Sequence, residues 1–324
     1  MNLYYPKIAR TMQLFNNCIV LLVIGGKMRK VKAMTLKERE ERLAYWFVIP
    51  TFIIVFGLVI YPALFNIWIS FHEVTLGNLG ERGVPFVGLK NYIRVAKDFL
   101  FKDALKATII YSLSGSIFSI LLGLAASLLL NRKFRGRGLV RAIFLFSYIA
   151  PVVSVAFIWK WLLNPVNGVI SWAFMSSHIW SKPIAMLSQR GWAMLIVVLF
   201  QGWRYFPFAM LMILAQLQAI PDELYEAADI DGAGVVKKFF YITLPELRYV
   251  LGTLFLLRLM WTFNKFDDIY LLTSGAAGTK VLPVLTYEFS FGMNHFGLGS
   301  ATSMFLFIIL GIFMIFYIKY ALEW

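Results

Sequence analysis

The sequence predicts an all-α, polytopic membrane protein with six transmembrane helices, and its composition and the layout of its apolar residues carry this prediction. Of its 324 residues, 60% are hydrophobic and only 15% are charged, against roughly 25% charged residues in a soluble domain. A soluble fold of this length cannot bury so much apolar surface, so most of it must face lipid. The apolar residues gather in long runs, and basic or polar segments separate these runs.

Six runs are long enough to cross a bilayer, which takes about 20 predominantly apolar residues. They cover residues 44–71, 105–130, 140–163, 192–218, 249–272 and 299–321. We expect one six-helix membrane domain over residues 44–324, preceded by a basic tail over residues 1–43. The apolar part of residues 8–24 is too short to cross and indicates an interfacial amphipathic helix, with a seventh span as the alternative.

Basic residues predict the orientation, because cytoplasmic loops are rich in lysine and arginine. Residues 27–42 carry seven basic residues, and residues 131–141 carry five and no acid. The loops at 164–190 and 274–298 together carry three, although the loop at 72–104 departs from this pattern. The chain is therefore expected to span its membrane several times, with both termini in the cytoplasm.

A polar segment between the fourth and fifth spans predicts a cytoplasmic helix-turn-helix. Pro221 suits the first turn of a helix, and the acidic residues after it favour the positive N-terminal end. This helix is expected to run to Ile230. Gly232 and Gly234 permit a turn, and a second helix is expected to end before Pro245. An ordinary amphipathic connector is the alternative interpretation of this segment.

The spacing within this segment matches a known pattern without a gap. Glu226-Ala227-Ala228 is followed after three residues by Gly232, and after nine more by Ile-Thr-Leu-Pro at 242–245. This resembles the coupling loop, here residues 220–245, of the permeases of binding-protein-dependent type I ABC importers. Residues 86–92 and 264–273 resemble the sugar-permease branch, the maltose and glycerol-phosphate importers. In its overall sequence, the chain also resembles the permeases of alginate-oligosaccharide importers.

The resemblance implies a bacterial cytoplasmic (inner) membrane as the location, and it also implies partners and roles. The loop would dock in a cleft of a separate ATP-hydrolysing subunit, through Glu226, Ala227, Ala228, Asp231, Gly232 and Ala233. A second, homologous permease would complete a heterodimer, with two ATP-binding subunits and a periplasmic solute-binding protein. ATP would bind to those subunits, so this chain would need no cofactor and contact membrane lipid but no nucleic acid.

The chemistry expected of an enzyme is missing from the sequence. It contains no phosphate-binding loop, catalytic triad, zinc-ligand spacing or paired-carboxylate arrangement. The single Cys18 excludes an internal disulfide, and the three histidines lie far apart. The chain is therefore not expected to be an enzyme or to bind a metal, and energy for transport must come from another subunit.

Polar and aromatic side chains at mid-depth in the fourth and fifth spans are candidates for substrate contact. Arg258 lies about nine residues, or ~14 Å, into its span. Trp261, Thr262 and Lys265 follow it on one helical face. Charge within a membrane segment indicates function by default, and aromatic rings with hydrogen-bonding groups suit a sugar. The candidates are Trp203, Arg204, Tyr205, Arg258, Trp261 and Asn264.

The two arginines favour a carboxylated sugar, because guanidinium groups pair with carboxylates in a bidentate manner. A structural interpretation remains open. Arg258 would then pair with a carboxylate of a partner chain, and Lys265 with Asp268, while the aromatic side chains pack against lipid. Asp267 and Asp268, near the outer end, are expected to serve structure or gating.

The favoured function is half of the translocation path for an oligosaccharide, opened alternately to the two sides of the membrane. Two alternatives stay open. An ion- or proton-coupled secondary carrier would use Arg258, Lys265 and the aspartates as relay groups, although such carriers usually show internal repeats and need no docking loop. A structural membrane subunit would move nothing.

Overall fold

The computed structural model describes residues 36–80 and 83–321, and these residues are nearly all helical. The described ranges contain no β-sheet, and their β-type pairing is an isolated bridge between His72 and Phe86. The all-α prediction is therefore confirmed. The interfacial helix expected within residues 8–24 lies outside the described residues.

The chain divides after Tyr61 into two units. The described part of the first contains helix α2 (Leu36–Val55) and the π-helical segment η1 (Phe56–Ile60). All of its side chains described from residue 44 onward are exposed. These side chains are strongly apolar, so the segment needs lipid or another chain around it.

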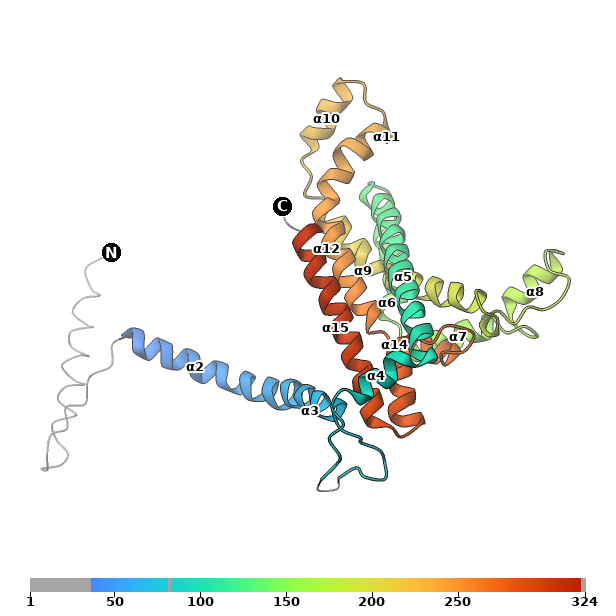
Figure 1. Cartoon of the computed structure of the whole chain (residues 1–324). Coiled ribbons are helices and arrows are strands. Elements are labelled where there is room, and N and C mark those ends of the chain that lie inside the picture. Colours follow the sequence, from blue (N-terminus) through green and yellow to red (C-terminus); the bar gives the residue numbers. More distant parts are fainter. Residues whose placement is uncertain (1–35, 81–82, 322–324) are drawn as a thin grey trace, which may run out of the picture. The chain divides into compact units, whose positions relative to one another are not determined.

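The second unit is built on four long helices. They are α5 (Phe99–Asn131), α9 (Trp192–Leu217), α12 (Leu244–Phe263) and α15 (Phe296–Ala321). The shorter elements are α3 (Tyr61–Ser70), α4 (Lys90–Lys97), α6 (Arg137–Ile149), α7 (Val152–Leu162), α8 (Val169–Ser176), η2 (Met186–Ser188), α10 (Asp222–Ile230), α11 (Val235–Lys238), η3 (Phe239–Thr243), α13 (Asp267–Thr273), α14 (Leu282–Tyr287) and η4 (Glu288–Gly292). In Figure 1, α10 and α11 lie together at one end of this unit.

Small residues allow α5 and α9 to pack closely. A Cβ atom added to Gly123 of α5 would lie 2.7 Å from the Cβ of Ala209, and one added to Gly202 of α9 would lie 2.0 Å from the Phe118 ring. Close approach through small side chains is how helices associate in a membrane, where apolar surface alone does not drive packing. The two helices thereby hold their polar side chains at a fixed separation.

Five helical segments are long and apolar enough to cross a membrane, among the residues that the structure describes. They are Ala44–Ser70, Phe99–Asn131, Trp192–Leu217, Val235–Phe263 and Phe296–Lys319. The third predicted span, residues 140–163, is the remaining one, and it is not one straight helix. It is divided into α6 and α7, which are bent by 96° relative to one another.

Proline explains the bend between α6 and α7. Pro151 has no backbone N–H to continue the helical pattern, and it disfavours helical geometry at the residue before it. Ala150 accordingly leaves the helix, with φ −58° and ψ 141°. A hydropathy average taken over the residues on both sides of such a break does not detect it.

The predicted fifth span, 249–272, is also wrong at both ends. Helix α12 ends at Phe263, and α13 begins separately at Asp267. The N-terminal end of this span also differs. The second helix of the cytoplasmic segment, which the sequence predicts to end before Pro245, continues through Pro245 into α12. The π-helical segment η3 directly precedes α12, in which Pro245 is the second residue, so the chain stays helical across it although the proline has no N–H to donate to the preceding turn.

Candidate functional site

A polar cavity of about 430 Å³ lies beside α9 and α12. Its lining residues are Tyr148, Gln201, Tyr205, Arg258, Met260, Trp261, Thr262, Asn264 and Lys265. Four of the predicted substrate residues are therefore brought together here: Tyr205, Arg258, Trp261 and Asn264. Because aromatic rings and hydrogen-bonding groups share this one cavity, it is the candidate substrate site.

Gln201 joins the two helices that line the cavity. Its side chain is buried, and its Nε2 donates a hydrogen bond to Thr262 Oγ1 at 2.9 Å. A Cβ atom at Gly115 of α5 would lie 2.5 Å from the Gln201 carbonyl oxygen. Glycine at that position is therefore what makes room for the amide, whose oxygen has no hydrogen-bond partner among the described residues.

Arg258 is buried without an acidic partner. Its side chain is 3% exposed, and its Nε donates to Ser119 Oγ at 3.3 Å. The guanidinium also lies over the Tyr205 ring, 4.7 Å from the ring centre. Within residues 36–80 and 83–321, no carboxylate comes within 4.0 Å of it, and its Nη2 has no hydrogen-bond partner. A buried cation without an acidic partner is unfavourable, so binding of a further acceptor to this guanidinium is favoured.

Asp268 lies past the end of α12 and ties the site together. Its carboxylate accepts one hydrogen bond from Tyr205 and one from Tyr111 of α5, each at 3.2 Å. The side chain is fully buried. Burial raises the pKa of its carboxyl to about 6, and the neighbouring Lys265 ammonium acts in the opposite direction. The Lys265 ammonium and the hydrogen bond from Tyr111 both favour its ionised form.

Lys265 pairs with a different aspartate from the one that the sequence suggested. Its Nζ lies 3.0 Å from Asp267 Oδ1, while Asp268 is held by the two tyrosines. The ammonium also lies 5.0 Å from the centre of the Tyr205 ring. Tyr205 is thus contacted by both cations of the cavity, which fixes its ring as one wall of the site.

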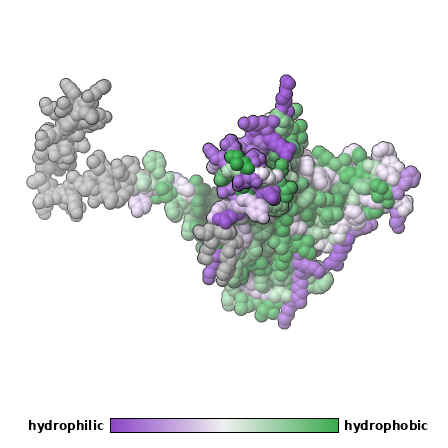
Figure 2. Space-filling model, turned by 90° about the horizontal axis from the view of Figure 1, so that it is seen from above, coloured by the Kyte–Doolittle hydropathy of each residue, from purple (hydrophilic) through white to green (hydrophobic). Residues whose placement is uncertain are grey.

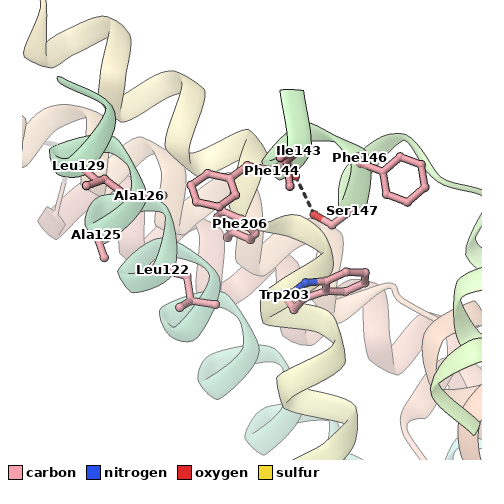
Figure 3. Close-up of a pocket in the computed structure, with 10 residues that line it drawn as sticks. All are labelled: Leu122, Ala125, Ala126, Leu129, Ile143, Phe144, Phe146, Ser147, Trp203 and Phe206. Atoms are coloured by element: carbon pink, nitrogen blue, oxygen red, sulfur yellow. Dashed lines mark hydrogen bonds between the residues drawn. The ribbon is translucent and has the colours of Figure 1, made fainter. Parts of the chain in front are cut away.

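Two of the predicted substrate residues point elsewhere. The Arg204 Nη2 donates to the Ala150 carbonyl at 2.7 Å, and its Nη1 to the Ser147 carbonyl at 3.4 Å. It therefore supplies donors at the break between α6 and α7. Trp203 packs against Trp159 and lines a separate, apolar groove, shown in Figure 3.

Sequence reasoning missed the contributions of neighbouring helices. Tyr111 of α5 and Tyr148 of α6 reach the site from other helices. One signal for α5 was available, since Ser112, Ser116 and Ser119 lie at helical spacing within an apolar segment. All three are buried.

The second candidate site is the elbow formed by α10 and α11. The end of α10 has the hydrogen bonds of a Schellman motif: Ala233 N–H to the Ala228 carbonyl at 2.8 Å, and Gly232 N–H to the Asp229 carbonyl at 3.1 Å. Gly232 adopts φ +71°, a left-handed conformation that favours glycine. The turn predicted at this glycine is therefore present.

Two contacts stiffen the elbow. An ion pair joins Lys238 to Asp229, and the Tyr225 and Thr243 hydroxyls lie 3.0 Å apart in a hydrogen bond. Among the predicted coupling residues, Glu226, Ala227, Asp231 and Gly232 are exposed, while Ala228 and Ala233 are partly buried. Ile230 and Tyr241 are 88% and 81% exposed. Figure 2, which looks onto this end, shows hydrophilic residues gathered over it.

The cavity and the elbow are connected by continuous helices. From Tyr205, α9 continues for 12 residues to its end at Leu217, a rise of about 18 Å. From Leu244, α12 runs 14 residues to Arg258, about 21 Å. Within the described ranges, no cluster of three or more potential metal-ligating side chains occurs.

Comparisons with known proteins agree on the type of protein. A family model described as "Binding-protein-dependent transport system inner membrane component" matches residues 98–323. The chain is 37% identical to the inner membrane ABC transporter permease protein YcjO of Escherichia coli (strain K12), over 81% of this chain and 88% of that protein. It is 36% identical to the trehalose/maltose transport system permease protein MalF of Thermococcus litoralis, over 88% and 95%.

The fold also matches a solved structure. A crystal structure of a bacterial ABC transporter involved in the import of the acidic polysaccharide alginate superposes with a TM-score of 0.74 at 22% identity, covering 87% of this chain and 96% of that chain. The family model covers well over half of the chain, and two relatives exceed 30% identity over most of it. The chain therefore belongs to the family of binding-protein-dependent transport system inner membrane components, the permeases of ABC importers.

Proposed function

We propose that the chain forms half of the path by which an ATP-driven importer moves an oligosaccharide, and that the cavity beside α9 and α12 takes the sugar. One observation carries this proposal: the helices that line the cavity are the same helices that end at the elbow. Trp261 and Tyr205 supply ring faces, and Gln201, Asn264 and Lys265 supply hydrogen-bonding groups for hydroxyls.

The elbow is the proposed docking surface for an ATP-binding subunit. Its exposed apolar side chains, Ile230 and Tyr241, would be covered by that subunit, and Glu226 and Gly232 would lie at the contact. Two such subunits serve the complete importer, and ATP binds to them and not to this chain. Closure of the ATP-binding subunits would then move α9 and α12 as rigid levers and open the cavity alternately to the two sides.

A second permease and an extracytoplasmic binding protein complete the proposed assembly. A related but different chain would supply the other half of the path, and the binding protein would deliver the sugar from the side opposite the elbow. In the proposed assembly both termini would lie in the cytoplasm, together with the elbow and the segment at 131–141, and the basic residues of that segment support this orientation.

An acidic sugar is the substrate that the charges favour. Arg258 has no carboxylate partner among the described residues, and its guanidinium borders the cavity beside Lys265. A uronate carboxylate would supply the missing acceptor. Thermal-shift assays of the cognate binding protein with neutral and uronate oligosaccharides test this, and a clear preference for neutral sugars would remove the charge argument.

Uptake by the reconstituted importer tests the cavity itself. Trp261 lines the cavity and is 45% exposed. Replacing it with alanine removes a ring face, and we expect uptake of labelled oligosaccharide to fall at least tenfold. A tenfold fall corresponds to about 1.4 kcal/mol of lost interaction free energy. Trp172→Ala in α8 removes an exposed ring outside the cavity and is the matched control. Equal uptake by both variants would place the sugar elsewhere.

A further inference from the structure

An apolar groove of about 620 Å³ lies between α5, α6 and α9, apart from the sugar cavity. Leu122, Ala125 and Leu129 of α5 form one side, and Ile143 and Phe144 of α6 form the other (Figure 3). Its polar lining groups are the indole N–H of Trp203 and the Ser147 hydroxyl, which already donates to the Phe144 carbonyl at 3.0 Å. The groove therefore offers a ligand almost nothing but hydrocarbon contact.

A basic cluster borders one end of this groove. It consists of Arg132, Lys133, Arg135, Arg137 and Arg141, with no acid between residues 131 and 141. None of the five pairs with a carboxylate in the part of the chain that the structure describes. The Nε atoms of Arg137 and Arg141 are buried and lack a hydrogen-bond partner there.

Helical spacing connects the basic cluster to the groove. Arg137, Arg141 and Phe144 follow one another at intervals of four and three residues, so they share one face of α6. On α5, Leu129 is within the last turn before Arg132. The same end of α5 carries Leu128, which packs in one cluster with Tyr225 of the elbow. The basic cluster is therefore on the elbow's side of the membrane.

We propose that this groove binds an anionic phospholipid, with Arg137 and Arg141 at its phosphate and one acyl chain along α5 and α6. From Leu122 to Leu129 the groove extends about 10 Å, which fits within one leaflet of a ~30 Å hydrocarbon core. Charge complementarity selects this occupant: basic pockets between membrane helices bind anionic headgroups. A helix from a partner permease would fill the apolar part and leave five cations uncompensated.

Trp203 gives the groove its own reporter, because its ring lines it. The assembled importer is reconstituted into phosphatidylcholine vesicles that contain, as a minor component, either brominated phosphatidylglycerol or brominated phosphatidylcholine. Bromine quenches tryptophan on contact. The quenching that reports on this groove is the part that is lost when Trp203 is replaced with phenylalanine. We expect it to appear with phosphatidylglycerol at much lower lipid fractions than with phosphatidylcholine.

Two variants separate the charge from the groove. Arg137→Gln with Arg141→Gln should weaken phosphatidylglycerol binding by at least about fivefold for each arginine lost, while the same two positions changed to lysine should retain most of it. Ala125→Phe fills the apolar groove without adding a tryptophan, and it should abolish the quenching of Trp203 at unchanged charge. Arg248→Gln on α12, outside the groove, is the control for general surface charge.

Two results would overturn the proposal. Equal quenching by the two lipids, unaffected by the arginine variants, would mean that the groove holds ordinary bilayer lipid without headgroup selection. Absence of any quenching that depends on Trp203, in an assembled importer, would mean that a partner chain covers the groove. Neither result depends on transport, so the outcome is independent of the proposed sugar substrate.

Discussion

Asp268 holds three helices together through two tyrosine hydroxyls. Its carboxylate accepts from Tyr111 of α5 and from Tyr205 of α9, while its own chain position is in α13. Because Asp268 and Tyr111 are both fully buried, the hydrogen bond between them is shielded from water. Tyr205 in turn lies beneath Arg258 and Lys265, so one acidic side chain sets the position of the cavity's aromatic wall.

Tyr111→Phe should therefore destabilise the protein without altering its packing. It removes one hydrogen bond to a buried charge, which typically costs about 1.5–3 kcal/mol. Denaturant titration of the solubilised importer measures this loss, with Tyr45→Phe, at an exposed position, as the control. An unchanged free energy of unfolding in Tyr111→Phe would mean that the Asp268 contact does not contribute to the fold.

Gly123→Ala should separate α5 from α9. The added methyl group would lie 2.7 Å from the Ala209 Cβ and 2.9 Å from the Met210 nitrogen, which is part of the backbone and cannot rotate away. Overpacking of this kind costs about 1–3 kcal/mol. Gly138→Ala meets no atom within 4 Å and is the matched control. Equal thermal stability of the two variants would contradict the close packing.

The helices depart from their predicted boundaries where proline and charge interrupt apolar sequence. Hydropathy alone located the spans that became α5, α9 and α15, because each is one continuous apolar helix. It did not detect the 96° bend at Pro151, since the runs on both sides are apolar. It also placed the end of α12 too late, because the apolar residues of α13 follow Asp267 and Asp268 closely.

Arg204 is expected to stabilise this bend. It donates to the Ser147 and Ala150 carbonyls, which the break leaves without helical partners. Arg204→Met would leave both acceptors unpaired in a buried region, at a cost of about 1–3 kcal/mol. With a cysteine introduced at Val153, maleimide labelling should become faster in Arg204→Met, whereas Lys182→Met in the exposed loop should not change it. Unchanged labelling would assign Arg204 another role, substrate contact included.

The candidate substrate site was partly predictable for a geometric reason. Helical periodicity placed Arg258, Trp261 and Lys265 on one face of a single helix, and the cavity contains all three. Periodicity also shows why Trp203, Arg204 and Tyr205 cannot all face one cavity, since successive residues are about 100° apart on a helix. Tyr111 and Tyr148 depend on which helices become neighbours, and a single sequence does not state that.

At the scale of the second unit, a cavity of about 430 Å³ and the elbow lie at different levels, and two continuous helices connect them. Under the proposed function, movement of the elbow drives transport. The elbow's turn depends on Gly232, whose φ is +71°, whereas the nearby Gly234 has φ −70° and accepts a side chain without strain. The pair therefore allows the turn to be altered while the length and charge of the elbow are kept.

Uptake of labelled oligosaccharide by the importer, reconstituted in vesicles with its binding protein and supplied with ATP, tests this claim most directly. We expect uptake to require ATP, to be lost in Glu226→Ala, and to fall severalfold in Gly232→Ala, since a left-handed alanine costs roughly 1–2 kcal/mol. Gly234→Ala should transport normally. Uptake that continues without ATP, or that ignores both the Glu226 and Gly232 substitutions, would contradict the account and favour a secondary carrier.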